Sequence, residues 1–400
     1  AGAAETGRLM DAALSLTKES DMTAKERGVE ILAALSSSSP VKEELAHGSG
    51  RVARSAVDAL CKSDLKDVAG SDPVAYGVAT LLANLTITND ELRRRHFREK
   101  DMDITPEQYD EFARITKQKT ESQEDADRDT EDLAAARRRR VVLADGAALV
   151  SRLALSSPSS QTAEKLAECL ANLAKDRDLR GVLVQQSGFK AAVALSSANN
   201  VGEKTTNSSS SSKSSQDSVS YSDKCRVNAA HAAAKILVTT DPRNLTDAQS
   251  LAAIRPLVWL CRKLDALELM HFEATLALTN LLSLGDDHKR RVAKEHGVRT
   301  LEYLQFSDNK MVQRAATEAL NNMIPDPDML AHLKKPDKLR LWFAFAGEWP
   351  GDEDEEDDGA DKEARQEAQP ESSSSGTTTS PPPTSEKRAL ASAALGCLAM

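Results

Sequence analysis

One short phrase recurs along this chain at a nearly constant spacing. Each copy is an apolar turn of helix that ends in an asparagine: LLAN ends at Asn84, CLAN at Asn172, ALTN at Asn280 and ALNN at Asn322. The last two of these asparagines are 42 residues apart. A repeat of that length, with two or three helices per unit, is typical of armadillo and HEAT solenoids. The spacing predicts an all-α, armadillo-type, right-handed superhelical solenoid, a class that usually binds other proteins.

The best-preserved unit covers residues 296–324. Gly297 begins an expected helix with apolar residues three apart, Asp308 and Asn309 break the chain, and a second helix follows with Val312, Ala316 and Leu320 on one face. These stripes have the period that a helix needs to pack on its neighbours. Gly146 and Gly188, again 42 residues apart, begin similar units. In the unit that starts near Ile254, Pro256 is expected in the first turn of a helix.

Three expansions interrupt the period. Residues 196–222 are rich in Ser and Asn, and residues 351–387 join an acidic run to a Ser-, Thr- and Pro-rich stretch, so both are predicted to be disordered loops. Removing the first insert restores the spacing and places Lys235 where other units have Asn. The charged stretch 90–140 contains residues 104–118, where Tyr109, Phe112 and Ile115 share one face of a predicted helix.

The composition argues against several function classes. Asp and Glu number 62 against 52 Lys and Arg, a net charge of −10, which disfavours nucleic acid as the main partner. No apolar run is long enough to cross a membrane, and no membrane partner is expected. The five cysteines show no metal-ligand spacing, so we expect free thiols in a reducing cytoplasm, with no metal and no cofactor.

Neither a catalytic motif nor a clear charge site stands out. His271 and Glu273 are close in sequence but point in different directions on a helix, so the chain is not expected to be an enzyme. The run of four arginines at 137–140 is interpreted as a solvated helix start rather than a phosphate or acidic-partner site. Trp259 is expected in a core stripe, whereas residues 342–349, WFAFAGEW, are too apolar to be fully exposed without a reason.

The recurring asparagines have two possible roles. In an armadillo stack, the last helix of each unit lines the concave surface, so its amide could hold the backbone of an extended peptide. The alternative is that each Asn ties neighbouring helices or loops together. The residues four before each Asn are not tryptophan, which disfavours a receptor for nuclear-localisation signals; they are Thr80, Glu168, Leu276 and Glu318.

Several blocks together resemble the UCS-domain myosin chaperones. They are VAYGVATLLANLT, ITPEQYDEFARITKQ, RRVVLADGAALVSRLAL, IRPLVWL and ALELMHFEATLALTNLLSL, and they run in the same order over nearly the whole chain. The resemblance implies that residues 1–88 are the end of a central armadillo domain, 89–138 a charged helical bridge, and 139–400 the first UCS armadillo repeats.

This family resemblance implies a myosin co-chaperone as the function. The expected partners are the myosin motor domain, held in the concave groove, and a heat-shock chaperone, which the family holds through a tetratricopeptide domain missing from these residues. By position, Phe272 and Asn280 match the family's groove motif, Asn322 lies one repeat further, and Arg314 projects from the same repeat. The competing hypothesis is a general armadillo scaffold that joins two proteins without chaperone activity.

Overall fold

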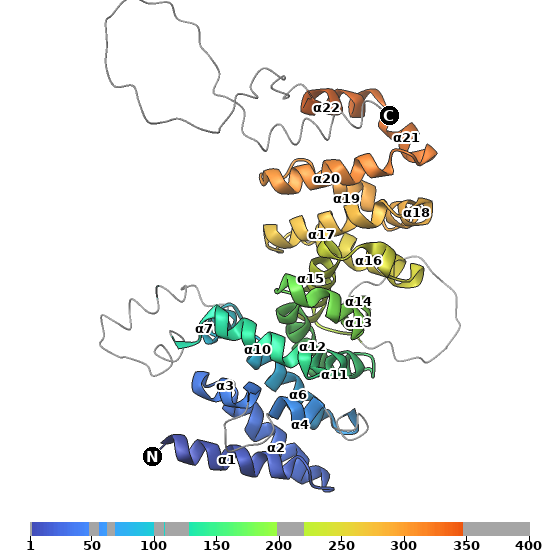
Figure 1. Ribbon diagram of the computed structural model, residues 1–400. Helices are drawn as coiled ribbons and strands as arrows, with labels where there is room; N and C mark the ends of the chain where they lie inside the picture. Colours follow the sequence, from blue (N-terminus) through green and yellow to red (C-terminus); the bar gives the residue numbers. More distant parts are fainter. Residues whose placement is uncertain are drawn as a thin grey trace, which may run out of the picture. The chain divides into compact units, whose positions relative to one another are not determined.

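The computed structural model describes residues 2–47, 56–61, 69–99, 108, 128–197 and 220–346 (Figure 1). Within these ranges the chain forms helices and no strands, so the predicted all-α class is confirmed. The chain divides into two compact units, Ala1–Ala277 and Leu278–Met400, and α17 (Glu268–Leu282) contributes residues to both. The right-handed superhelix stays a prediction.

Within the described ranges the first unit is a succession of helices. Its helices before α17 are α1 (Gly2–Leu16), α2 (Met22–Leu35), α3 (Ser39–His47), α4 (Ala56–Cys61), α6 (Asp72–Leu85), α7 (Asn89–Glu99), α10 (Glu131–Leu143), α11 (Gly146–Ala154), α12 (Ser160–Leu173), η1 (Arg177–Leu179), α13 (Arg180–Gln185), α14 (Gly188–Ser197), α15 (Asp223–Thr239), η2 (Pro242–Asn244) and α16 (Asp247–Arg262).

The core of the first unit is a row of long helices that pack one on the next. α2 contacts α6, α6 contacts α12, and α12 contacts α15, as can be followed in Figure 1. Small and medium side chains make this close stacking possible: α12 buries Ala163, Leu166, Ala167 and Leu170 completely or nearly so. Burial of about 25 cal/mol per Å² of such apolar surface is the main force that holds each helix on its neighbours.

The turn before each repeat glycine has one conformation. Asp145, Ser187 and His296 all have φ near 60°, and each is followed by the glycine that begins the next helix. At Gly146 a β-carbon would lie 2.7 Å from the backbone oxygen of Val141. A side chain would therefore clash with the preceding helix, which explains why the sequence repeat carries glycine here.

The second unit contains the repeat that the sequence predicted most fully. Beyond its part of α17 it has α18 (Asp286–Lys294), α19 (Gly297–Leu304), α20 (Lys310–Met323), α21 (Pro327–Leu333) and α22 (Pro336–Ala346). α19 begins at Gly297 as predicted, and Asn309 caps α20 by accepting hydrogen bonds from the backbone of Met311 and Val312. Val312, Ala316 and Leu320 are all buried, which confirms the predicted stripe.

Two expectations about helix ends were wrong. Pro256 is not in a first turn but lies well inside α16, because a capping box between Thr246 and Gln249 starts that helix upstream. The residues at both ends of the predicted 196–222 insert are structured: Ser196 lies in α14 with its hydroxyl bonded to Ala192, and Tyr221 is buried beside the start of α15. The remainder of that insert, nearly all of 104–118, residues 347–387 and Cys397 lie outside the described residues.

The interpretation of the arginine run was also wrong. Arg137 and Arg138 lie in the middle of α10, and their exposed fractions are 0% and 1%. The Arg137 guanidinium pairs with Asp129 at 2.8 Å and with Glu43 at 2.6 Å, and it donates to the backbone oxygens of Leu85 and Ile87. Arg139 and Arg140, by contrast, are exposed and half-buried. The carboxylates that compensate Arg137, those of Asp129 and Glu43, lie outside the run, so the run alone could not reveal that its charges are buried.

Lys42 joins the same network. Its ammonium group lies 2.8 Å from Asp129, both side chains are fully buried, and it also donates to the backbone oxygen of Ile87. Burial lowers the pKa of Lys42 to about 8, although the hydrogen bond and charge of Asp129 act in the opposite direction. These ionic contacts fix α3 and α10 against the end of α6, directly before α7 begins.

Candidate binding surface

Asn172 is the most completely satisfied of the recurring asparagines. Its amide nitrogen donates to the backbone oxygen of Ala83 at 3.2 Å and to the hydroxyl of Thr86 at 3.1 Å, so it ties α12 to α6. Its amide oxygen accepts a hydrogen bond of 2.7 Å from Arg95 of α7. Asn172 is fully buried, and no acceptor or donor of this amide is left for a partner.

Asn322 repeats the first of these contacts in the second unit. Its amide nitrogen donates to the backbone oxygen of Thr279 at 3.1 Å, which ties α20 to α17. Thr279 directly precedes Asn280, just as Ala83 directly precedes Asn84. The two asparagines thus bond to equivalent carbonyls one repeat earlier. We use "rung" for the residue at the position of the recurring asparagine in each unit, which is Lys235 in one of them. At both rungs the amide nitrogen ties neighbouring helices together, which is the second of the two roles considered for the asparagines from the sequence.

The two rungs differ in what covers the amide oxygen of the asparagine. At Asn172, α7 covers the amide oxygen, and a further ion pair between Lys175 and Glu91 holds α7 in place. At Asn322 the side chain is half-buried, and among the described residues its amide oxygen has no hydrogen-bond partner. An acceptor in that state is available to the backbone or side chain of a bound chain.

The rung at Lys235 is closed by an ion pair. The Lys235 ammonium group lies 2.8 and 2.9 Å from the two carboxylate oxygens of Glu273 on α17, and the same carboxylate bonds to His231. Burial alone would raise the pKa of Glu273, but the hydrogen bonds from His231 and Lys235 outweigh it and hold that pKa below its usual range. Burial has the opposite effect on a base and lowers the pKa of His231.

The remaining predicted groove residues lie on α17 and α20. Phe272 and Asn280 are both half-buried and stand about two turns apart on α17. Arg314 is exposed and pairs with Glu318 on its own helix at 2.8 Å. The second unit therefore brings Asn280, Arg314 and Asn322 onto two adjoining helices, and whether they bind a client stays a prediction.

Other candidate groups turn out to be structural. His271 does not face Glu273 and instead bonds to the backbone oxygen of Lys263 at 2.9 Å. Trp259 is half-buried, with the Arg226 guanidinium 4.0 Å above its ring, while Trp342 is buried and Phe343 is 63% exposed. Over the described ranges there is no cluster of His, Cys, Asp or Glu that could hold a metal ion, and no helix long and apolar enough to cross a membrane.

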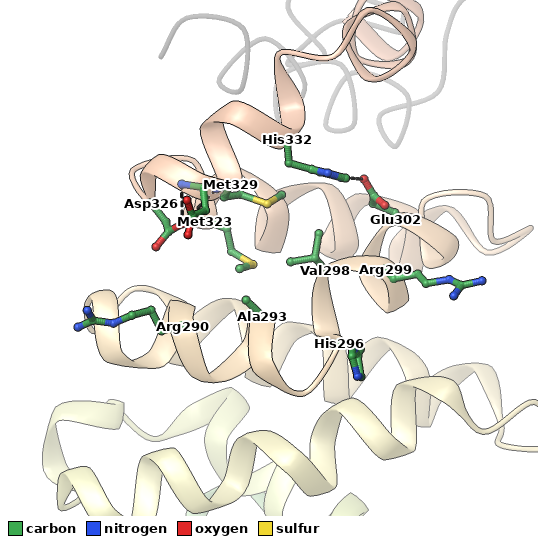
Figure 2. A pocket seen from close by; sticks show the side chains of 11 residues that line it. Arg290, Ala293, His296, Val298, Arg299, Glu302, Met323, Asp326, Met329 and His332 are labelled. Atoms are coloured by element: carbon green, nitrogen blue, oxygen red, sulfur yellow. Dashed lines mark hydrogen bonds and ion pairs between the residues drawn. The ribbon is translucent and has the colours of Figure 1, made fainter. Parts of the chain in front are cut away.

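A separate cavity lies among α18, α19, α20 and α21 of the second unit. It has a volume of about 480 Å³, and Figure 2 shows Met323, Met329 and Val298 turned toward it, with Arg290 and Arg299 at its edges. At one end His332 of α21 bonds to Glu302 of α19 at 2.8 Å, and Lys338 pairs with the same carboxylate. The apolar floor can accept an aliphatic side chain, but no rung residue lines this cavity.

Sequence reasoning missed Arg95 and Glu91 of α7. Arg95 bridges the Glu91 carboxylate and the Asn172 amide, at 3.0 and 2.7 Å from the same guanidinium nitrogen. Nothing in the local pattern RRRH distinguishes Arg95 from its exposed neighbour Arg94. Only the contact with a residue 77 positions away reveals its role.

Fold and surface together define a helical repeat protein that offers partly open polar rungs, a class suited to holding another polypeptide. The proteins similar to this chain are UNC-45 myosin chaperones, which confirms the resemblance drawn from the sequence. Protein unc-45 homolog B of Danio rerio is 27% identical over 335 residues, which is 82% of this chain and 31% of the relative. Ring assembly protein 3 of Schizosaccharomyces pombe is 37% identical over 107 residues, 25% of this chain and 14% of the relative.

Solved structures agree on the fold. The myosin chaperone UNC-45 from C. elegans in complex with a Hsp70 peptide is 20% identical, covers 88% of this chain and 33% of its own, and gives a TM-score of 0.62. UNC-45 from Drosophila melanogaster gives a TM-score of 0.52 at 20% identity, over 98% of this chain and 51% of its own. No family model matches. The chain spans just under a third of the length of the vertebrate relative.

Proposed function

We propose that this chain is part of a non-enzymatic, myosin-directed co-chaperone. The similarity to UNC-45 proteins over four-fifths of the chain carries this proposal, and the open amide at Asn322 gives it a physical basis. The client is the myosin motor domain, and the protein works in the cytoplasm. The similar worm protein has been solved with a Hsp90 peptide and with a Hsp70 peptide, so a heat-shock chaperone is the expected second partner.

The proposed mechanism is passive holding. An extended, partly unfolded segment of the motor lies along the face of the rungs, where the amides of Asn280 and Asn322 bond to its backbone. Phe272 contacts an apolar side chain of that segment, and Arg314 lies at the exposed edge of the same surface. Each contact replaces one that the unfolded segment would otherwise make with another unfolded motor, so bound segments are kept from aggregating.

The test is thermal aggregation of a myosin motor domain, followed by light scattering, with the chain or its Asn280→Ala, Asn322→Ala double variant. We expect the chain to suppress scattering and the double variant, matched for helicity by circular dichroism, to lose most of that effect. A chain that binds folded motor but gives no protection would point to a general armadillo scaffold. Equal protection by both proteins would keep the chaperone function and remove the two asparagines from it.

A further inference from the structure

The motif Glu-x-x-x-Asn occurs in two of the rung helices. α12 carries Glu168 and Asn172, and α20 carries Glu318 and Asn322. Residues four apart lie on the same face of a helix, so each pair presents a carboxylate and an amide side by side. The equivalent carbonyl contacts of Asn172 and Asn322 show that the two pairs occupy equivalent places in their repeats.

In α12 the chain's own cations fill both acceptors. Glu168 lies 3.0 Å from Lys165 and 2.7 Å from Lys224, and Arg95 donates to the amide oxygen of Asn172. Burial would raise the pKa of Glu168, but the charges and hydrogen bonds of the two lysines hold it below its usual range. Two lysines thus pair with the carboxylate of Glu168, and one arginine bonds to the amide of Asn172.

In α20 the same acceptors are largely unfilled. Within the described part of the chain, Glu318 has a single cationic partner, Arg314 of its own helix, and their side chains are 33% and 52% exposed. An exposed pair of this kind contributes little to stability and exchanges readily for another partner. The amide oxygen of Asn322 accepts no hydrogen bond from a described residue.

We infer that Glu318 and Asn322 form a binding site for a basic side chain, most simply an arginine, of the bound polypeptide. This rests on the proposed function and narrows its client segment to one that carries an arginine. Arg95 shows part of this chemistry, because one of its guanidinium nitrogens bonds both to Glu91 of its own helix and to the equivalent asparagine, Asn172. The planar guanidinium has five donors and can bridge two such acceptors, which an ammonium group does less well.

Arg314 has a definite place in this inference. It holds the Glu318 carboxylate when no client is bound, and an incoming arginine must displace it. Removing Arg314 should therefore strengthen binding of an arginine, whereas removing the charge of Glu318 should weaken it. The two substitutions should therefore change the affinity in opposite directions. General damage to the surface would instead weaken binding in both variants.

The experiment uses two fluorescein-labelled probe peptides, Gly-Leu-Arg-Leu-Arg-Leu-Gly and the same peptide with citrulline in place of arginine. Citrulline keeps the shape of arginine but carries no charge. Fluorescence anisotropy gives the dissociation constants for the chain and for Glu318→Gln, Arg314→Ala and Glu295→Gln. Glu295 is the matched control, since it pairs with Arg291 at the same four-residue spacing at the C-terminal end of α18, away from the rungs.

We expect the arginine peptide to bind more tightly than the citrulline peptide. Glu318→Gln should reduce that preference about three- to fivefold, and Arg314→Ala should raise the affinity for the arginine peptide about twofold. Glu295→Gln should change neither value. A preference that is absent, or that survives in Glu318→Gln, overturns the inference, and so does a failure of both peptides to bind. Motor protection is measured separately, so the proposed function can stand when this site fails.

Discussion

The rungs at Asn172 and Asn322 start from the same sequence motif and make the same contact with the preceding repeat, yet one is sealed and the other is open. The difference comes from α7, which is outside the repeat pattern and covers Asn172 through Arg95. Around Asn322 the described residues include no equivalent helix in contact with the amide oxygen. The comparison teaches that the repeat fixes the position of a rung, whereas an element outside the repeat decides whether it can bind.

The two regions also differ in how their charges are held. Near Asn172 the ionic groups Lys42, Asp129, Arg137 and Arg138 are all buried, whereas near Asn322 the pair of Arg314 and Glu318 is exposed. Buried charges are expensive to leave unpaired, and exposed pairs are not. Substitutions should therefore have large effects on stability in the first region and small ones in the second.

The largest difference is expected for arginine removal. Arg137→Ala removes one of the two fully buried cations that pair with the fully buried Asp129, and should lower the free energy of unfolding by about 3–5 kcal/mol. Arg314→Ala should lower it by less than about 0.5 kcal/mol. Urea unfolding followed by circular dichroism measures both. Similar losses in the two variants would contradict the assignment of the α10 network as the firmly held region.

Replacing the asparagines should also destabilise the first region more than the second, but by a smaller margin. Asn172→Ala removes three hydrogen bonds in a buried place, to the Ala83 carbonyl, the Thr86 hydroxyl and the Arg95 guanidinium, and should cost about 2–3 kcal/mol of unfolding free energy. Asn322→Ala removes one hydrogen bond at a half-exposed place and should cost about 1 kcal/mol. Equal losses, measured by the shift in urea midpoint, would mean that α7 does not seal the first rung.

The pH dependence of stability should show the state of Lys42. Its folded pKa of about 8 lies below the unfolded value near 10.5, so between these values the unfolded chain binds more protons. The stabilising contribution is full above pH 10.5 and is lost as the pH falls through 8. Relative to Lys42→Met, the chain should gain about 1 kcal/mol of unfolding free energy between pH 7 and pH 9. A constant difference over that range would show that Lys42 is not buried as described.

The sequence allowed good prediction wherever the determinant is local and repeated. The glycines at 146, 188 and 297, the cap at Asn309 and the stripe of α20 follow from spacing, because the same turn recurs before each of these glycines. The position of Pro256 was predicted wrongly, because a proline can be tolerated inside a helix whose start is fixed by a cap further upstream. The roles of Arg95, Arg137 and Arg138 could not be predicted, because each has one partner that lies 38 to 94 residues away, namely Asn172, Glu43 and Asp176, and a run of arginines is usually solvated.

The most direct test of the open and sealed rungs is photo-crosslinking to a heated myosin motor domain. A benzophenone amino acid replaces Arg314 in one variant and Glu164 in the other; these residues stand eight positions before Asn322 and Asn172, respectively. Mass spectrometry of the products then identifies what each position touches. The account predicts abundant crosslinks from position 314 to the motor and few from position 164. Equal crosslinking at both positions, or crosslinking from position 164 alone, would contradict it.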